Sequence, residues 1–155
     1  MDQCVLAAAT DVWATMLGWN LTAPAVAEAK GPPTSFPLLA INGCVGFAGN
    51  LTGSVFLSCE THLGERMARI ILGDSGGLTA REVSDVVGEL TNMLAGGCVS
   101  RLRDQGFTLA MSIPNVIRGV SIQATSRDVT FLIRRRFFLA GGTESVQVTV
   151  AGKTD

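Results

Sequence analysis

The chain has 155 residues, of which 47% are hydrophobic and 16% are charged, and its formal net charge is −1. These values predict one globular domain over residues 1–155, because disordered chains carry fewer apolar and more charged residues. The near-zero net charge argues against a general nucleic-acid binder. No apolar run reaches the roughly 18 residues of a membrane span, and the first residues lack the basic stretch of a signal peptide.

The four cysteines stand far apart, at Cys4, Cys44, Cys59 and Cys98, and no two of them form a Cys-x-x-Cys pair. His62 is the only histidine, so the chain lacks the ligand pattern of a zinc site. We therefore expect reduced, buried thiols in a cytoplasmic protein that has no metal site. His62 itself is expected to be an exposed surface residue.

The chain is expected to begin with a helix. Apolar residues at helical spacing predict this helix over residues 2–17, and Gly18 is placed to end it. Residues 23–37 are rich in proline, alanine and glycine and predict a loop more clearly than any other stretch of the chain.

A β-hairpin and a second helix are expected next. Alternating apolar residues predict a strand over residues 38–48, a turn over residues 50–53 and a second strand over residues 54–59. Thr61 is a candidate cap for a helix that runs to about Leu72.

Residues 78–106 predict the longest helix. Thr79 and Glu82 have the spacing of a capping box, and Gly106 is placed to end the helix. One side is apolar and predicts contact with a core: Val83, Val86, Val87, Leu90, Met93, Leu94, Gly97 and Cys98. The opposite side carries mostly polar or small residues: Asp85, Gly88, Glu89, Asn92, Gly96, Val99 and Arg103.

The second side of this helix is unusual because it combines an acid, an amide and two glycines. Glu89 and Asn92 are neighbours on the helix surface, and Gly88 and Gly96 flank them. Each interior glycine costs about 1 kcal/mol of helix propensity relative to alanine. Two interpretations remain open from the helix alone: a surface that another protein approaches closely, or an ordinary solvated face.

The last third of the chain predicts strands. A short extended piece over residues 107–112 ends before Pro114, and further strands are expected over residues 119–125, 129–139 and 143–150. The whole order predicts an α+β domain with an antiparallel sheet and helices packed on one face. The valine-rich strands near the C-terminus are candidates for pairing across a dimer axis, because exposed strand edges are usually covered.

Arg134, Arg135 and Arg136 form the only run of like charges. In a strand these side chains point alternately to the two faces of the sheet, so they do not form one patch. A solvated strand end is the favoured interpretation, and docking to an acidic partner is the alternative.

The long helix resembles the active-site helix of the CheC/CheX/FliY family of chemotaxis phosphatases. The resemblance rests on the spacing Asp-x3-Glu-x2-Asn at Asp85, Glu89 and Asn92, and on Pro114 a little over twenty residues further on. The surrounding GELTNMLAGG and the hairpin pattern IxGxVGFxGxLxGxVFLS are also similar to the family. The helix after the hairpin has no second Glu-x-x-Asn, so the chain is most similar to the single-site CheX branch. That similarity implies a mixed α/β fold and a homodimer.

The resemblance implies a phosphatase that acts on the aspartyl phosphate of a CheY-type response-regulator receiver. Asn92 would orient the attacking water, since an amide offers both a donor and an acceptor. Glu89 would pair with a lysine of the receiver, and Asp85, Gly88 and Gly96 would contact the partner. The receiver would bring its own Mg²⁺, so this chain would bind no cofactor.

Two other classes of protein remain as alternatives. The first is a non-catalytic binding module for receivers or for partners like those of the flagellar switch. The second is a structural domain that only oligomerises through a sheet edge. Release of phosphate from a phosphorylated receiver discriminates between the enzyme and both alternatives.

Overall fold

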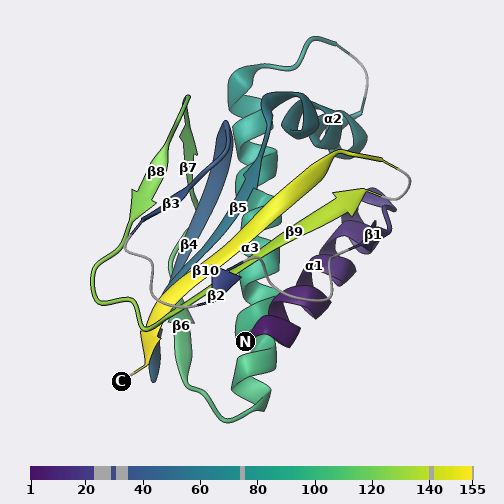
Figure 1. Cartoon of the computed structure of the whole chain (residues 1–155). Helices are drawn as coiled ribbons and strands as arrows, with labels where there is room; N and C mark the ends of the chain where they lie inside the picture. Colours follow the sequence, from purple (N-terminus) through teal and green to yellow (C-terminus); the bar gives the residue numbers. More distant parts are fainter. Residues whose placement is uncertain (23–28, 31–34, 74–75, 140–141, 155) are drawn as a thin grey trace.

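A computed structural model of the chain (Figure 1) describes residues 1–22, 29–30, 35–73, 76–139 and 142–154. Most of the loop expected over residues 23–37 therefore lies outside the described residues. The helices and strands follow in this order: α1 (Asp2–Leu17), β1 (Leu21–Thr22), β2 (Ala29–Lys30), β3 (Ser35–Pro37), β4 (Ile41–Gly49), β5 (Leu51–Cys59), α2 (Thr61–Leu72), α3 (Ala80–Asp104), β6 (Leu109–Met111), β7 (Asn115–Arg118), β8 (Gln123–Thr125), β9 (Phe131–Leu139) and β10 (Ser145–Thr154).

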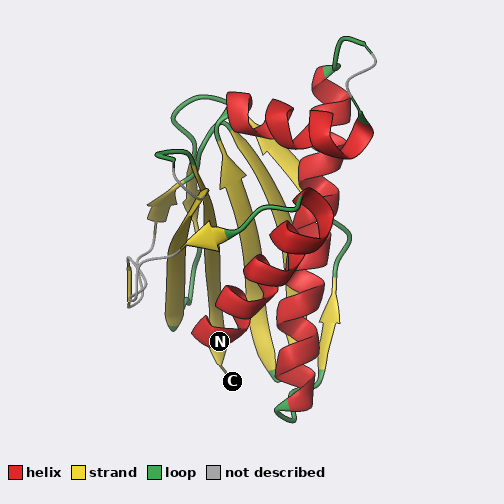
Figure 2. Cartoon of the chain, turned by 90° about the vertical axis from the view of Figure 1, so that its right-hand side faces the viewer, coloured by secondary structure: helices red, strands yellow, loops and turns green. Residues whose placement is uncertain are grey.

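The strands form one large antiparallel sheet and one small two-stranded sheet. Within the described residues the large sheet has the order β1-β9-β10-β5-β4-β6, with β2 also on β9 and β7 also on β4, and β3 pairs with β8. Turned by 90°, the chain shows its helices gathered on one side of the sheet (Figure 2). The predicted α+β fold is thus confirmed.

The C-terminal strand β10 lies in the middle of the sheet. It pairs with β5 from Gln147 to Thr154 and with β9 from Ser145 to Gly152. Because both of its edges are occupied, the expectation that the valine-rich C-terminal strand pairs across a dimer axis is wrong. Its valines Val146, Val148 and Val150 are fully buried instead.

Helix α3 begins and ends where local chemistry predicts. The backbone N–H of Glu82 donates to Thr79 Oγ1 at 3.1 Å, and the N–H of Thr79 donates to Glu82 Oε2 at 2.8 Å. This capping box satisfies two of the backbone donors that a helix start leaves free. At the other end Gly106 takes a positive φ of 96°, which glycine adopts at little cost.

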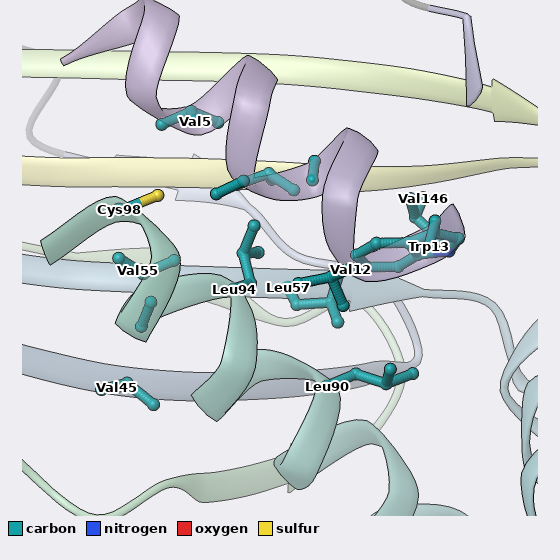
Figure 3. Close-up of a cluster of buried hydrophobic side chains, with 14 of the residues drawn as sticks. Val5, Val12, Trp13, Val45, Val55, Leu57, Leu90, Leu94, Cys98 and Val146 are labelled. Atoms are coloured by element: carbon teal, nitrogen blue, oxygen red, sulfur yellow. The ribbon is translucent and has the colours of Figure 1, made fainter. Parts of the chain in front are cut away.

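The core lies between α1, α3 and the helix-facing side of the sheet (Figure 3). Trp13 of α1 and Leu90 and Leu94 of α3 are fully buried there. Strands β4, β5 and β10 contribute further buried side chains to this core: Val45, Val55, Leu57 and Val146. Burial of each such large apolar side chain stabilises the fold by roughly 1.5–3 kcal/mol, so this layer holds α3 firmly against the sheet.

The arginine run on β9 anchors two segments rather than forming a solvated strand end. Arg135 has a side-chain exposure of 3% and binds Asp2 at the start of α1 through Nε–Oδ1 (2.7 Å) and Nη2–Oδ2 (2.6 Å) contacts. Arg134 points to the opposite face, where its Nη2 donates to the backbone oxygen of Pro37 and its guanidinium lies over Phe36. The predicted alternation of the side chains is confirmed, and the predicted solvation of Arg135 is wrong.

Several predicted boundaries move by a few residues. The hairpin turn is tighter than expected, because β4 runs to Gly49 and β5 already starts at Leu51. Asn50 at its tip accepts a hydrogen bond from the backbone of Thr108, which ties the hairpin to the start of β6. Thr61 is the first residue of α2 rather than its cap, a position taken by Glu60. No helix of the described residues is long and apolar enough to span a membrane.

Candidate functional site

The exposed side of α3 carries the residues that sequence analysis singled out. Asp85 and Glu89 are exposed, and Asn92 and Gly96 are half-buried. Within the described part of the chain, the side chains of Glu89 and Asn92 have no hydrogen-bond or ion-pair partner. Both groups are therefore available to a molecule that approaches this side of the helix.

The two glycines of this helix side differ in their surroundings. A Cβ on Gly96 would meet no atom within 4 Å, so this glycine lies open to an approaching partner. Gly88 is buried, and a Cβ there would lie 3.2 Å from Val116 Cγ2 of β7. Val99 is also buried, at 2% exposure. The placement of Gly88 and Val99 on the exposed side is thus wrong, because β7 and the core cover this flank of the helix.

Strand β7 runs along α3 as one border of the candidate site. Arg118 donates from Nη1 to the backbone oxygen of Ala80 (2.6 Å) and to Ser84 Oγ (3.2 Å). Two residues earlier in the strand, Val116 faces Gly88, which lies four residues further along the helix than Ser84. These contacts show that β7 and α3 run in opposite directions, side by side.

The rise of β7 over two residues is close to the rise of α3 over four. Two strand residues span about 6.6 Å and four helix residues span about 6 Å, so each strand step of two matches one helix step of four. Arg118 meets Ser84 and Val116 meets Gly88 in this way, and Pro114 stands two residues before Val116, just outside the start of β7.

A close contact between the helix and the sheet fixes the turn that holds Asn92. Thr91 is fully buried and donates from Oγ1 to the backbone oxygen of Val87 at 2.6 Å. A Cβ on Gly43 of β4 would lie 1.8 Å from Thr91 Oγ1, so only glycine fits at this position. In the sequence, Gly43 is only one position of the hairpin pattern, which carries no signal of this contact.

A buried asparagine ties together the strands beneath this turn. Asn42 donates from Nδ2 to the backbone oxygens of Leu39 (2.7 Å) and Ile117 (3.2 Å). It is fully buried, and these bonds satisfy an amide that would otherwise be costly to bury. Asn42 thereby joins β4 to β7 and holds the border strand in place. A lone asparagine within an alternating strand carries no signal of this role in the sequence.

The cysteines and the histidine of the described residues lie away from the candidate site or are buried. No group of three or more His, Cys, Asp or Glu residues within the described residues is placed to hold a metal ion. Burial raises the pKa of both the Cys59 and the Cys98 thiols to about 12, which keeps them protonated and unreactive at neutral pH. His62 is exposed, as expected, and its Nε2 lies 2.9 Å from Glu144 Oε1.

Comparison with known proteins identifies the fold. A solved structure from Desulfovibrio vulgaris Hildenborough, assigned as a chemotaxis protein, has a TM-score of 0.84 at 20% identity, over 97% of this chain and 95% of that one. CheX from Desulfovibrio desulfuricans has a TM-score of 0.79 at 22% identity, over 99% and 97%. CheX in the CheX–CheY–BeF₃–Mg²⁺ complex of Borrelia burgdorferi has a TM-score of 0.74 at 21% identity, over 97% and 96%. Among curated proteins, no sequence matches this chain.

Helices layered on one face of an antiparallel sheet, with the long helix exposed beside an edge strand, define a CheX- or CheC-like chemotaxis fold. The family described as chemotaxis phosphatase CheX matches residues 41–134, more than half of the chain. The chain belongs to the CheX family of chemotaxis phosphatases.

Proposed function

We propose that this protein hydrolyses the aspartyl phosphate of a CheY-type receiver domain. The observation that carries the proposal is the pair Glu89 and Asn92, which stand without described partners on the exposed side of α3. Membership of the CheX family and the CheX–CheY complex from Borrelia burgdorferi support a receiver as the substrate. The buried turn at Thr91 supports the same reading, because a catalytic amide needs a fixed position.

Asn92 supplies the chemistry in this proposal. Its amide can accept a hydrogen bond from a water molecule and donate a second one toward the phosphoryl group. Water held in this way attacks the phosphorus in line with the bond to the aspartate oxygen, and the aspartate leaves as a carboxylate. The gain comes from positioning rather than from a nucleophile of the enzyme.

Glu89 fixes the receiver in register with Asn92. Its carboxylate is exposed, one helical turn before the amide, and would pair with the lysine of the receiver. Mg²⁺ belongs to the receiver in this proposal. The phosphatase contributes one acid and one amide, held at fixed spacing by the helix.

A non-catalytic binding module is the second candidate. An open Gly96 and an exposed acidic helix side would serve docking alone equally well. The distinction lies in whether Asn92 accelerates hydrolysis or only contacts the partner.

The test uses phosphorylated receivers from the same cell, incubated with and without this protein. The proposal expects faster release of phosphate from at least one receiver, measured together with its binding affinity. Binding without faster release would establish the binding module. Neither binding nor release with any receiver would overturn both candidates.

We also propose a homodimer, on the resemblance to CheX. Among the described strands, β7 is a candidate dimer edge, because β4 is the one strand it pairs with. Two apolar residues that flank β7 are strongly exposed, Ile113 at 80% and Val120 at 93%. Light scattering at micromolar concentration should then give twice the 16.2 kDa mass of the chain. A mass equal to one chain would contradict this. A cytoplasmic location also stays a prediction.

A further inference from the structure

An apolar hollow of about 300 Å³ lies directly beside the candidate site. It is bounded by the C-terminal end of α1, the C-terminal end of α2 and the first half of α3. Its lining is Met16, Ile71, Leu72, Glu82, Asp85, Val86, Glu89 and Leu90. Glu89 therefore belongs both to the candidate site and to the wall of this hollow.

The floor of the hollow is part of the core, whereas its mouth is open. Leu90 and Val86 are buried, and Met16 and Ile71 are partly buried against the same core. Leu72 at the end of α2 is 50% exposed. An exposed leucine beside an apolar hollow retains surface that a docking partner can remove from water.

The charged side chains that line the hollow, among the described residues, all have one sign. Three carboxylates, those of Glu82, Asp85 and Glu89, line it, and no basic side chain of the described part of the chain does. Glu82 is engaged in the capping box with Thr79, which leaves the exposed Asp85 and Glu89 to meet a partner. The hollow therefore favours an apolar side chain that is accompanied by a basic residue and disfavours an acidic segment.

We infer that this hollow receives an apolar side chain of the same receiver that presents its lysine to Glu89. The inference rests on the proposed function and adds a second anchoring point to it. A receiver seated on Glu89 and Asn92 lies against the mouth of the hollow, because Glu89 stands on its wall. The acidic rim matches the lysine, and the apolar floor matches its apolar neighbour. Such a pocket gives affinity, while Asn92 gives rate.

The test compares two substitutions on one helix, Leu72→Gln and Ile70→Gln. Both residues are exposed to a similar extent, at 50% and 44%, but only Leu72 lines the hollow. The exchange to glutamine removes apolar surface without adding charge. With the full chain and a phosphorylated receiver as substrate, Leu72→Gln should raise KM at least tenfold and leave kcat within twofold of the wild type. Ile70→Gln should leave both within twofold.

Met16→Gln provides an independent variant on α1, which also lines the hollow, and it should raise KM in the same way even if Leu72→Gln folds poorly. Unchanged KM values in both hollow variants, with an active wild type, would overturn this inference and leave the proposed function standing. A wild type that neither binds nor dephosphorylates receivers would overturn both. A change from dimer to monomer mass in the hollow variants would assign the hollow to a second copy of this chain and would also overturn it.

Discussion

Gly43 of β4 and Thr91 of α3 lie so close together that the strand has no room for a side chain at this position. A Cβ on Gly43 would lie 1.8 Å from Oγ1, 2.7 Å from Cβ and 3.1 Å from Cγ2 of Thr91. Rotation of the threonine cannot relieve this overlap, because its Cβ is involved. The contact therefore sets how deep the helix sits on the sheet, one residue before the amide that we propose to be catalytic.

The first prediction concerns this contact. Gly43→Ala should push α3 away from β4, cost about 1–3 kcal/mol of stability and lower the rate of receiver dephosphorylation by roughly tenfold or more. Gly46→Ala is the matched control, because its Cβ would meet Ser112 Oγ at an ordinary 3.5 Å. Urea unfolding and phosphate release measure the two effects. Equal behaviour of the two variants would show that the contact does not position the helix.

The second prediction concerns Asn92. Asn92→Ala removes the water-positioning amide and little contact area, so the dephosphorylation rate at saturation should fall by roughly 10²-fold or more. Receiver affinity and the melting temperature should change little, because the side chain has no partner within the described chain. Ser100→Ala, at an exposed position of the same helix, controls for the change in helix propensity. A wild-type rate in Asn92→Ala would replace the catalytic interpretation by the binding module.

The third prediction separates Glu89 from Asn92. Glu89→Gln keeps the size of the side chain and removes its charge, so pairing with a receiver lysine should weaken. We expect a higher KM together with a slower reaction at saturation, because the receiver then docks in poorer register. The loss of affinity should shrink as salt is added, since salt also screens the wild-type pair. An unchanged KM in titrations at low and high salt would argue against the lysine contact.

The fourth prediction uses the two glycines of α3 as a pair. Gly96→Leu should block receiver binding and raise stability by up to about 1 kcal/mol, because its side chain enters open space. Gly88→Leu should instead lower stability by about 1–3 kcal/mol, because its side chain collides with Val116. Thermal melts and receiver titrations of both variants test this. Loss of stability in Gly96→Leu would mean that this side of the helix is packed.

The fifth prediction concerns pH. The pKa values of Cys59 and Cys98 are raised to about 12 by burial, whereas a thiol in the unfolded chain has a value near 9.0. Between these values the folded state keeps protons that the unfolded state loses, so stability should fall as pH rises above about 9. The chain has no tyrosine to mask this trend. Urea unfolding between pH 7 and 10.5 should show the decline, and native protein should resist alkylation of both thiols at pH 8.

Local signals explain which parts of the fold the sequence predicts well. The start of α3 is encoded by Thr79 and Glu82 alone, and the end of α1 by Gly18 in the left-handed conformation. Strand order is different, because it depends on which strands pair over long distances. The alternating valines of β10 predict a strand but do not reveal that it lies between β5 and β9. Arg135 likewise shows its burial only once α1 brings Asp2 to it.

The residues of the candidate site also differ in how far the sequence predicts them. Glu89, Asn92 and Gly96 follow from helical spacing, since one helix presents all of them. Gly88 lies on the same side of the helical wheel, yet β7 covers it through Val116. A helical wheel cannot show that an edge strand will pack there. The roles of Gly43, Thr91 and Arg118 are not predictable from the sequence for the same reason, because each role is a contact between two elements.

Along the border of the site, the position of an inserted residue matters more than the number of residues inserted, because side chains of β7 alternate between the two faces of the sheet. Inserting one residue between Val116 and Arg118 would turn Val116 to the other face of the sheet while Arg118 stayed in place. Inserting one residue between Gly106 and Leu109 would only lengthen a connection. The number of residues between α3 and β7 can therefore change without moving Val116 or Arg118, provided that every added residue falls in the connection and none in the strand.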